Sequence, residues 1–199
     1  GGTVRYPRGY GWADRERRLP VRPESLFRIA SLSKPITSVA ILQLVERRKF
    51  DLDGRVVSLL PREAATEFAD ERWRRITVRQ LLQHTGGWDR GTSFDPMFRS
   101  RQIAAARGVA APAGPREIID FMRGQPLDFD PGTRYAYSNF GYCLLGRIIE
   151  EATGVAYERY VRREVLAPLG IRRMRLGQSL LPDQARGETR YYMPRDEMA

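Results

Sequence analysis

Residues 27–35 read Phe-Arg-Ile-Ala-Ser-Leu-Ser-Lys-Pro and place Ser31 and Lys34 at the start of a predicted helix. That helix runs from Ser31 to about Arg48, and its apolar residues occur nearly all round the helix axis. Such a pattern predicts a helix that is buried on most of its faces. Pro35 is compatible with it because the residue falls in the first turn, where a missing N–H costs no helix bond.

Ser31 and Lys34 form an S-x-x-K motif, in which a lysine can activate a serine. Residues three apart share one face of a helix, so the Lys34 amine can reach the Ser31 hydroxyl. The start of a helix also stabilises a developing alkoxide and lets the N–H of Ser31 face an oxyanion. A neutral lysine can accept the proton, which an arginine cannot do because it stays protonated.

Other interpretations of this motif stay open. Nine serines and two lysines give about 0.1 S-x-x-K motifs by chance, and an N-cap serine followed by a solvated lysine is the structural alternative. A Ser/His/Asp triad would have to use His84, the single histidine, but no serine stands in a Gly-x-Ser-x-Gly turn. His84 lies at a predicted helix end, where a structural hydrogen bond is the commoner role.

A second segment, Tyr137-Ser138-Asn139, stands between the turn signal Asp130–Thr133 and an amphipathic helix that begins at Asn139. A tyrosine beside a lysine can share one proton with it and act as general acid or base. An asparagine side chain can hold a substrate carbonyl or amide and also steady the lysine. The segment therefore complements the S-x-x-K motif.

Four segments together resemble the serine beta-lactamase and penicillin-binding-protein superfamily. They are residues 27–35, Leu-Leu-Gln-His-Thr-Gly-Gly at 81–87, Pro-Gly-Thr-Arg-Tyr-Ala-Tyr-Ser-Asn-Phe-Gly-Tyr at 131–142 and Leu-Ala-Pro-Leu-Gly at 166–170. The Tyr-x-Asn form resembles the branch of class C beta-lactamases, DD-peptidases and carboxylesterases. The resemblance spans residues 8–175 and implies an α+β fold, in which a mainly helical region is inserted in an antiparallel-sheet α/β domain.

The resemblance also implies roles for individual residues. Ser31 would be the acyl-forming nucleophile, Lys34 its general-base partner and Tyr137 a proton relay, while Asn139 would contact substrate and Lys34. Whether Lys34 or Tyr137 takes the first proton stays open, because the pair should titrate as a coupled unit. The 81–87 segment would shape the site wall, which makes His84 structural. No metal or cofactor is implied.

One departure from the family concerns its third motif, Lys-Thr-Gly or His-x-Gly, on a later strand. The chain contains no Lys-Thr-Gly, and it has no second histidine after His84 for a later His-x-Gly. The opening helix, the closing strands and the final helix of the family are not seen in this chain either. That strand would supply the second oxyanion-hole N–H. We therefore expect residues 1–199 to be a single incomplete domain, truncated at both ends, whose sheet is incomplete.

Composition narrows the remaining classes. The net charge of +10 comes almost wholly from arginine, since Lys34 and Lys49 are the only lysines, and no nucleic-acid-binding motif accompanies it. Cys143 is the single cysteine, so the chain cannot form an internal disulfide. With one cysteine and one histidine it also cannot build a Cys/His zinc site. Asp51-Leu52-Asp53-Gly54 is interpreted as a turn rather than a calcium loop, because Arg55 replaces an oxygen ligand. No apolar run is long enough to span a membrane.

The remaining chain predicts several further elements. These are a strand region over Val4–Ala13, a short helix from Thr77 stopped at Gly86-Gly87, a long surface excursion from Asp89 to Pro115, helices over Pro115–Arg123, from Asn139 to Gly154 and from Tyr157 to Pro168, and a strand near Arg190–Tyr192. Cys143 falls in an apolar helical pattern and is expected to be a small core residue.

The sequence therefore predicts a serine hydrolase that forms an acyl-enzyme on a beta-lactam, peptide-amide or ester bond. Its partner would be a small-molecule or peptide acyl substrate, with no nucleic acid and no transmembrane segment. The alternatives are a non-catalytic relative that binds a ligand or peptide, and a basic nucleic-acid-binding module. Localisation and oligomeric state stay open, with a periplasmic or secreted location favoured over the cytoplasm.

Overall fold

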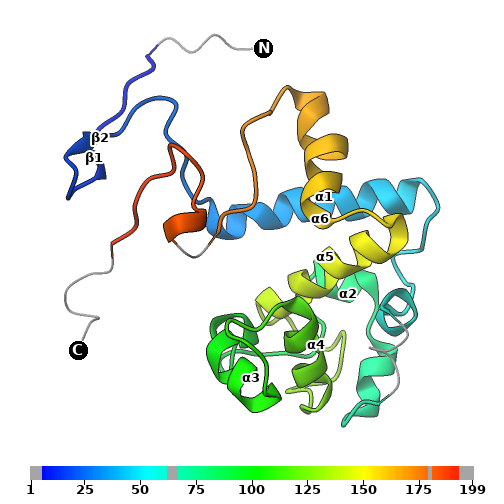
Figure 1. The fold of residues 1–199 in the computed structure, drawn as a ribbon. Coiled ribbons are helices and arrows are strands. Elements are labelled where there is room, and N and C mark those ends of the chain that lie inside the picture. The colour runs from blue at the N-terminus through cyan, green and yellow to red at the C-terminus, as the bar shows by residue number, and fades with distance from the viewer. Residues whose placement is uncertain (1–5, 62–66, 179–180, 193–199) are drawn as a thin grey trace. The chain divides into compact units, whose positions relative to one another are not determined.

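The computed structural model describes residues 6–61, 67–178 and 181–192 (Figure 1). The chain forms two compact units, one made of Gly1–Ser31 with Arg175–Ala199 and the other of Leu32–Met174. The second unit holds all six α-helices of the described ranges and almost all of the buried apolar core. The expectation of one incomplete domain stays a prediction.

The first unit contains a two-stranded antiparallel sheet. Strand β1 (Trp12–Asp14) pairs with β2 (Leu19–Pro20), and an isolated bridge joins Leu26 to Glu188. The expected strand over Val4–Ala13 is therefore largely wrong, because β1 begins only at Trp12; Val4 and Arg5 lie outside the described residues. A strand near Arg190–Tyr192 is also wrong: the Arg190 N–H bonds to the Ala13 carbonyl at 2.8 Å, but none of these three residues belongs to a strand among those that the structure describes.

Helix α1 (Ser33–Glu46) is the first element of the second unit, and the 3-10 turn Ala30–Leu32 leads into it. Its buried residues are Thr37, Ala40, Ile41 and Leu44. Val39 and Leu42 are 45% and 47% exposed, so the expectation of burial on most faces is wrong for the described structure. The helix packs against α5 and the helical segment Val161–Leu166 on one side, and its apolar residues continue beyond that contact.

Helix α5 (Asn139–Thr153) forms the centre of this unit. Ser138 is its N-cap and accepts a bond from Gly141 N–H at 3.1 Å, while Gly154 ends it in the left-handed conformation with φ of 66°. The predicted helix is confirmed, and it packs against α1, α2 and α4. Cys143, on this helix, packs against the core, and burial raises the pKa of its thiol to about 11.

Two shorter predicted helices are also confirmed, although the first ends at Leu82, before its expected stop at Gly86-Gly87. Helix α2 (Val78–Leu82) begins with a capping box in which the Thr77 side chain accepts from Gln80 N–H and the Gln80 side chain accepts from Thr77 N–H. Helix α4 (Pro115–Arg123) begins at a proline, as the sequence indicated. The turn at Asp51–Gly54 is confirmed by a bond from Gly54 N–H to the Asp51 carbonyl at 3.0 Å.

The expected surface excursion between Asp89 and Pro115 is wrong in one respect. It contains the 3-10 turn Pro96–Phe98 and helix α3 (Ser100–Arg107), which packs against α4 (Figure 1). Ile103 and Ala104 are buried on that contact. The helix was missed because eight residues with so few large apolar side chains give too short a pattern to detect.

The last helical stretch lies where the sequence predicts it, but only its first four residues are α-helical. Helix α6 (Tyr157–Tyr160) passes into a π-helical turn, Val161–Leu166, and a 3-10 turn, Ala167–Leu169, and ends at Gly170 with φ of 74°.

Further 3-10 turns lie at Val56–Leu59, Glu71–Arg75 and Leu181–Asp183. No helix within the described ranges combines the length and apolarity needed to cross a bilayer.

An aromatic cluster lies at the heart of the core. The Trp88 ring contacts both the Trp73 and the Phe140 rings edge to face, each pair with centroids 4.9 Å apart. Phe140 is the second residue of α5, so this cluster fixes the start of the helix that carries Asn139.

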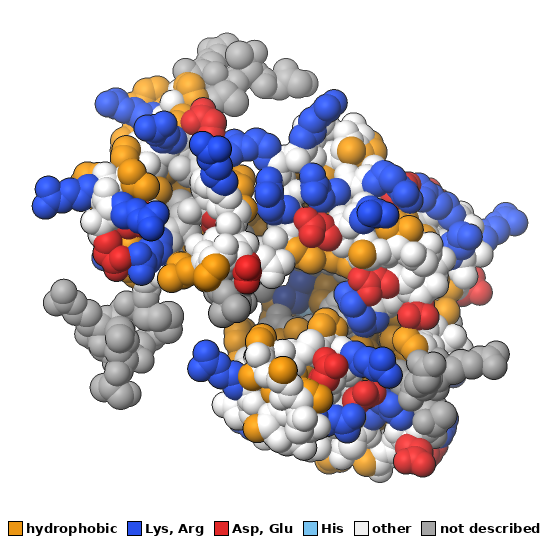
Figure 2. Space-filling view, viewed as in Figure 1, with side chains coloured by type: hydrophobic (Ala, Val, Ile, Leu, Met, Phe, Trp, Pro, Cys, Tyr) orange, Lys and Arg blue, Asp and Glu red, His pale blue; other side chains and the backbone are white. Residues whose placement is uncertain are grey.

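Basic and acidic side chains are interspersed on the face that Figure 2 shows. Lys and Arg side chains are scattered over the visible face with Asp and Glu side chains between them (Figure 2). Several arginines form ion pairs, among them Arg47 with Glu164 at 2.9 Å and Arg79 with Asp53 at 2.8 Å.

Candidate active site

Ser31 and Lys34 lie where the chain enters α1. Ser31 is exposed and is the last residue of the first compact unit, while Lys34 is the second residue of α1 and half-buried. Ala30, directly before Ser31, has φ of 44°, a left-handed conformation that is strained for a residue other than glycine. The chain thus makes a sharp turn immediately before the serine.

Lys34 is joined to the Tyr-Ser-Asn segment by a short hydrogen bond. Its Nζ donates to Oδ1 of Asn139 at 2.6 Å, across 105 residues of sequence. The Nδ2 of Asn139 in turn donates to Oδ2 of Asp95 at 2.7 Å. The three side chains form a continuous hydrogen-bonded chain of amine, amide and carboxyl groups from α1 through α5 to the loop before α3.

Aromatic rings flank the Lys34 amine. Its Nζ lies 4.7 Å from the centroid of the Tyr137 ring and 5.6 Å from that of Tyr142. The guanidinium of Arg90 lies 5.1 Å from the Tyr137 centroid. Two basic side chains therefore lie over the Tyr137 ring as cation–π contacts.

His84 forms hydrogen bonds to the Tyr-Ser-Asn segment and to the residue before it. Its Nδ1 accepts the N–H of Ser138 at 3.1 Å, and its carbonyl accepts the N–H of Ala136 at 2.8 Å. Its ring packs against those of Tyr137 and Tyr142, with centroids 4.7 and 5.1 Å away. Burial, together with the charge of Lys34, holds the pKa of His84 below its ordinary value of 6.5. A neutral imidazole with Nδ1 as acceptor suits this role.

The backbone around His84 pairs with the segment that precedes Tyr137. The Gly132 N–H donates to the Thr85 carbonyl and the Asp128 N–H to the Gly87 carbonyl, both at 2.8 Å. Gly87 has φ of 114°, and a Cβ there would meet the Phe129 carbonyl oxygen at 3.0 Å. The glycine is needed for this close approach.

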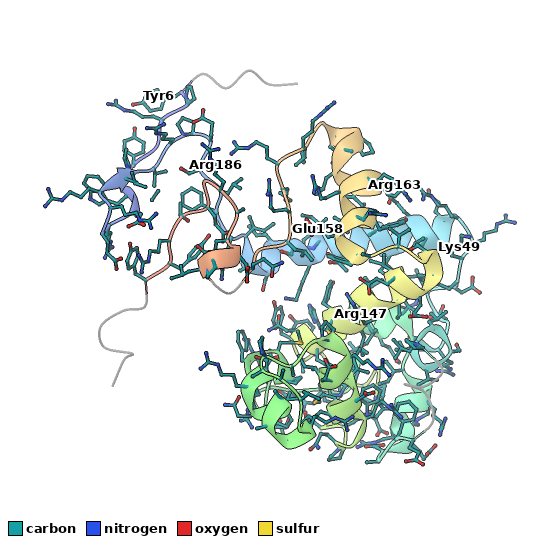
Figure 3. All side chains as sticks on the ribbon, viewed as in Figure 1. Tyr6, Lys49, Arg147, Glu158, Arg163 and Arg186 are labelled. Carbon is teal, nitrogen blue, oxygen red and sulfur yellow. The ribbon has the colours of Figure 1, made fainter. Side chains whose placement is uncertain are left out.

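Three of the four predicted site residues, Lys34, Tyr137 and Asn139, are brought together in the second unit. Ser31 lies three positions before Lys34 along the chain. Lys49, the other lysine, is exposed and lies past the C-terminal end of α1 (Figure 3). Within the described ranges no group of three or more His, Cys, Asp or Glu side chains is placed to hold a metal ion.

Asp95 and Tyr142 were not singled out from the sequence. Asp95 precedes a proline and caps the turn Pro96–Phe98, and Asp-Pro is a signal for a turn rather than for a site. Tyr142 stands three residues after Asn139 on α5, so helical spacing could have placed it on the same face.

Comparison with known proteins identifies the family. The model of the Beta-lactamase family matches residues 1–198. The chain is 33% identical over 183 residues to the probable fimbrial assembly protein FimD, serogroup H1, of Dichelobacter nodosus, covering 91% of this chain and 43% of that protein. It is 34% identical over 185 residues to esterase EstB of Burkholderia gladioli, covering 86% of this chain and 43% of that protein.

A solved structure agrees with these matches. The penicillin binding protein from Bacillus halodurans superposes with a TM-score of 0.73 at 26% identity, covering 95% of this chain and 55% of that one. The chain thus spans less than half the length of the two curated relatives. The resemblance and the α+β fold class drawn from the motifs are confirmed. The chain belongs to the Beta-lactamase family.

Proposed function

We propose that this chain carries the nucleophile of a serine hydrolase that works through an acyl-enzyme on Ser31. The observation that supports the proposal most is the 2.6 Å hydrogen bond from Lys34 Nζ to Asn139 Oδ1. It joins the S-x-x-K motif on α1 to the Tyr-x-Asn motif at the start of α5, as a shared site requires. The substrate is a small molecule or peptide with a beta-lactam, peptide-amide or ester bond.

In the proposed reaction, Ser31 Oγ attacks the substrate carbonyl carbon while its proton passes to the pair formed by Lys34 and Tyr137. The tetrahedral oxyanion collapses, the bond to the leaving group breaks, and the pair returns the proton to that group. Water then attacks the acyl ester and loses a proton to the same pair. As the bond between the acyl carbon and Ser31 Oγ breaks, the pair gives that proton to Oγ, which releases the acid and restores Ser31. Asn139 holds the substrate while its Oδ1 steadies the Lys34 amine.

Covalent labelling of the whole protein tests this proposal. A fluorophosphonate or a penicillin should add one adduct, detected by intact mass, and the Ser31→Ala variant should show none. Ser33→Ala is the matched control, because Ser33 is exposed and stands two residues away, and it should keep the adduct. No adduct on the wild type, or an equal adduct on Ser31→Ala, would contradict the nucleophile assignment.

Turnover assays separate the substrate classes. Matched beta-lactam, D-alanyl-D-alanine peptide and short-chain ester substrates should differ in kcat/KM, and the largest value identifies the class. The relatives named esterase and penicillin-binding protein make all three worth measuring.

A second candidate function is ligand or peptide binding without turnover, because one relative is named a fimbrial assembly protein. This candidate predicts saturable binding of a peptide that Ser31→Ala leaves unchanged, together with no adduct and no turnover.

A further inference from the structure

Asp95 makes a direct contact with the amide of Asn139, and no catalytic part is yet assigned to it. Its Oδ2 accepts the Nδ2–H of Asn139 at 2.7 Å, while Asn139 Oδ1 faces Lys34 Nζ at 2.6 Å. We propose that Asp95 is a positioning residue that orients the Asn139 amide and, through it, the Lys34 amine. The proposal rests on the proposed function of Ser31 and Lys34.

The chemistry of the three groups fixes which one donates and which one accepts in each hydrogen bond. An ionised carboxylate only accepts hydrogen bonds, so the Asn139 group that faces Asp95 has to be the NH₂. The amide oxygen is then turned toward Lys34, where it can accept a hydrogen bond. If the amide rotated by 180°, its NH₂ would face the Lys34 N–H groups and its oxygen would face the carboxylate. Asp95 therefore selects the one orientation that holds Lys34.

Asp95 can do this because its own position is fixed. Its other oxygen, Oδ1, accepts the N–H of Met97 at 3.0 Å and so caps the turn Pro96–Phe98. Pro96 is buried, and this turn packs against both α4 and α5. One carboxylate oxygen thus anchors the loop while the other contacts Asn139, so the two roles can be separated by mutation.

The effect on the reaction is one of geometry. A lysine side chain has four rotatable bonds, and a base contributes to the rate only while its nitrogen is held at the reacting proton. Asn139 Oδ1 provides such a restraint on Nζ. Loss of the preferred amide orientation should lower the rate of proton transfer more than it lowers substrate binding.

Asp95→Asn is the sharpest test, because it keeps the size and an oxygen that can still cap the turn. The new amide can donate as well as accept, so it no longer dictates the orientation of Asn139. We expect the rate constant for fluorophosphonate labelling of Ser31, and kcat on the best substrate, to fall about 10- to 100-fold. KM should change much less. Asp89→Asn is the matched control, since Asp89 lies in the same loop but bonds Gly91, Thr92 and Arg134.

A double-mutant cycle with Asn139→Ala separates positioning from folding. If Asp95 acts through Asn139, then Asp95→Asn should lower the labelling rate in the wild-type background and add nothing in the Asn139→Ala background. A wild-type labelling rate in Asp95→Asn would overturn the proposal. An undiminished loss in the Asn139→Ala background would also overturn it, because Asp95 would then act by capping its turn.

A spectroscopic measurement keeps the test independent of activity. The side-chain NH₂ protons of Asn139, assigned by their loss in Asn139→Asp, should shift and exchange faster with solvent in Asp95→Asn but not in Asp89→Asn. If the wild type shows no Ser31 adduct, the proposed function fails, and this measurement alone decides the contact. Unchanged Asn139 resonances in Asp95→Asn would overturn the positioning role.

Discussion

At the scale of single residues, the proposed mechanism requires Lys34 to be a lysine rather than simply a cation. Thirty-two of the 34 basic residues are arginines, and the other lysine, Lys49, is exposed beyond α1. Lys34 contacts the amide of Asn139 and the rings of Tyr137 and Tyr142. An arginine there could still donate to Asn139, but it could not take a proton from Ser31.

We therefore expect Lys34→Arg to lower kcat/KM by about 10²- to 10⁴-fold, the range that general-base catalysis contributes. Lys49→Arg is the matched control and should keep the wild-type value. Steady-state kinetics on the best substrate measure both. Activity within a few-fold of the wild type in Lys34→Arg would show that Lys34 acts only as a positive charge and that another group accepts the proton.

At the scale of secondary-structure elements, α5 carries the site through its first turn. Ser138, its N-cap, is buried and forms two hydrogen bonds. Its hydroxyl accepts from Gly141 N–H, and its own N–H donates to Nδ1 of His84. Tyr137 and Asn139 stand on either side of it. The cap therefore ties the start of the helix to the position of both candidate catalytic side chains.

Ser138→Ala should lower the free energy of unfolding by about 1 kcal/mol, the usual loss for an N-cap serine. Denaturant unfolding followed by circular dichroism measures this change. Ser33→Ala provides the comparison, since Ser33 lies inside the first turn of α1 and is not its N-cap. Equal midpoints for the wild type and Ser138→Ala would mean that the Gly141 N–H finds another partner at no net loss.

At the scale of the whole molecule, His84 links segments far apart in the sequence. It accepts bonds from Ala136 and Ser138, and its neutral form is favoured because burial and Lys34 lower its pKa. The unfolded chain, with a pKa near 6.5, takes up the proton first as the pH falls. Stability is then fully present above pH 6.5 and decreases as the pH falls below that value, until the folded state is also protonated.

The free energy of unfolding should accordingly fall between about pH 7 and pH 5 more steeply in the wild type than in His84→Asn. Asparagine tolerates the positive φ of 57° at this position and can accept the Ser138 N–H. Urea titrations at three pH values measure the slopes. Parallel slopes in the two proteins would show that His84 keeps an unperturbed pKa.

Local chemistry in the sequence determined several helix ends and the candidate site residues. The capping residues Thr77 and Ser138 and the terminal glycine Gly154 act over a few residues, so the start of α2 and both ends of α5 could be predicted from them. The end of α2 at Leu82 could not, because the nearest stop signal in the sequence is Gly86-Gly87. The S-x-x-K and Tyr-x-Asn motifs identified Lys34, Tyr137 and Asn139 as candidates. Helix α3 was not predicted, because its buried residues are defined by packing against α4 and no local sequence pattern shows that contact.

The tertiary structure alone decided how these residues meet. Asp95 was not singled out from the sequence, and only the packing of its loop against α4 and α5 brings its carboxylate to Asn139. The same is true of α1, whose apolar pattern is continuous but whose burial is limited to the side that contacts α5 and Val161–Leu166. Helix caps and turns are set by neighbours in sequence. A site is set by side chains from distant segments, and their contacts exist only once the core has packed.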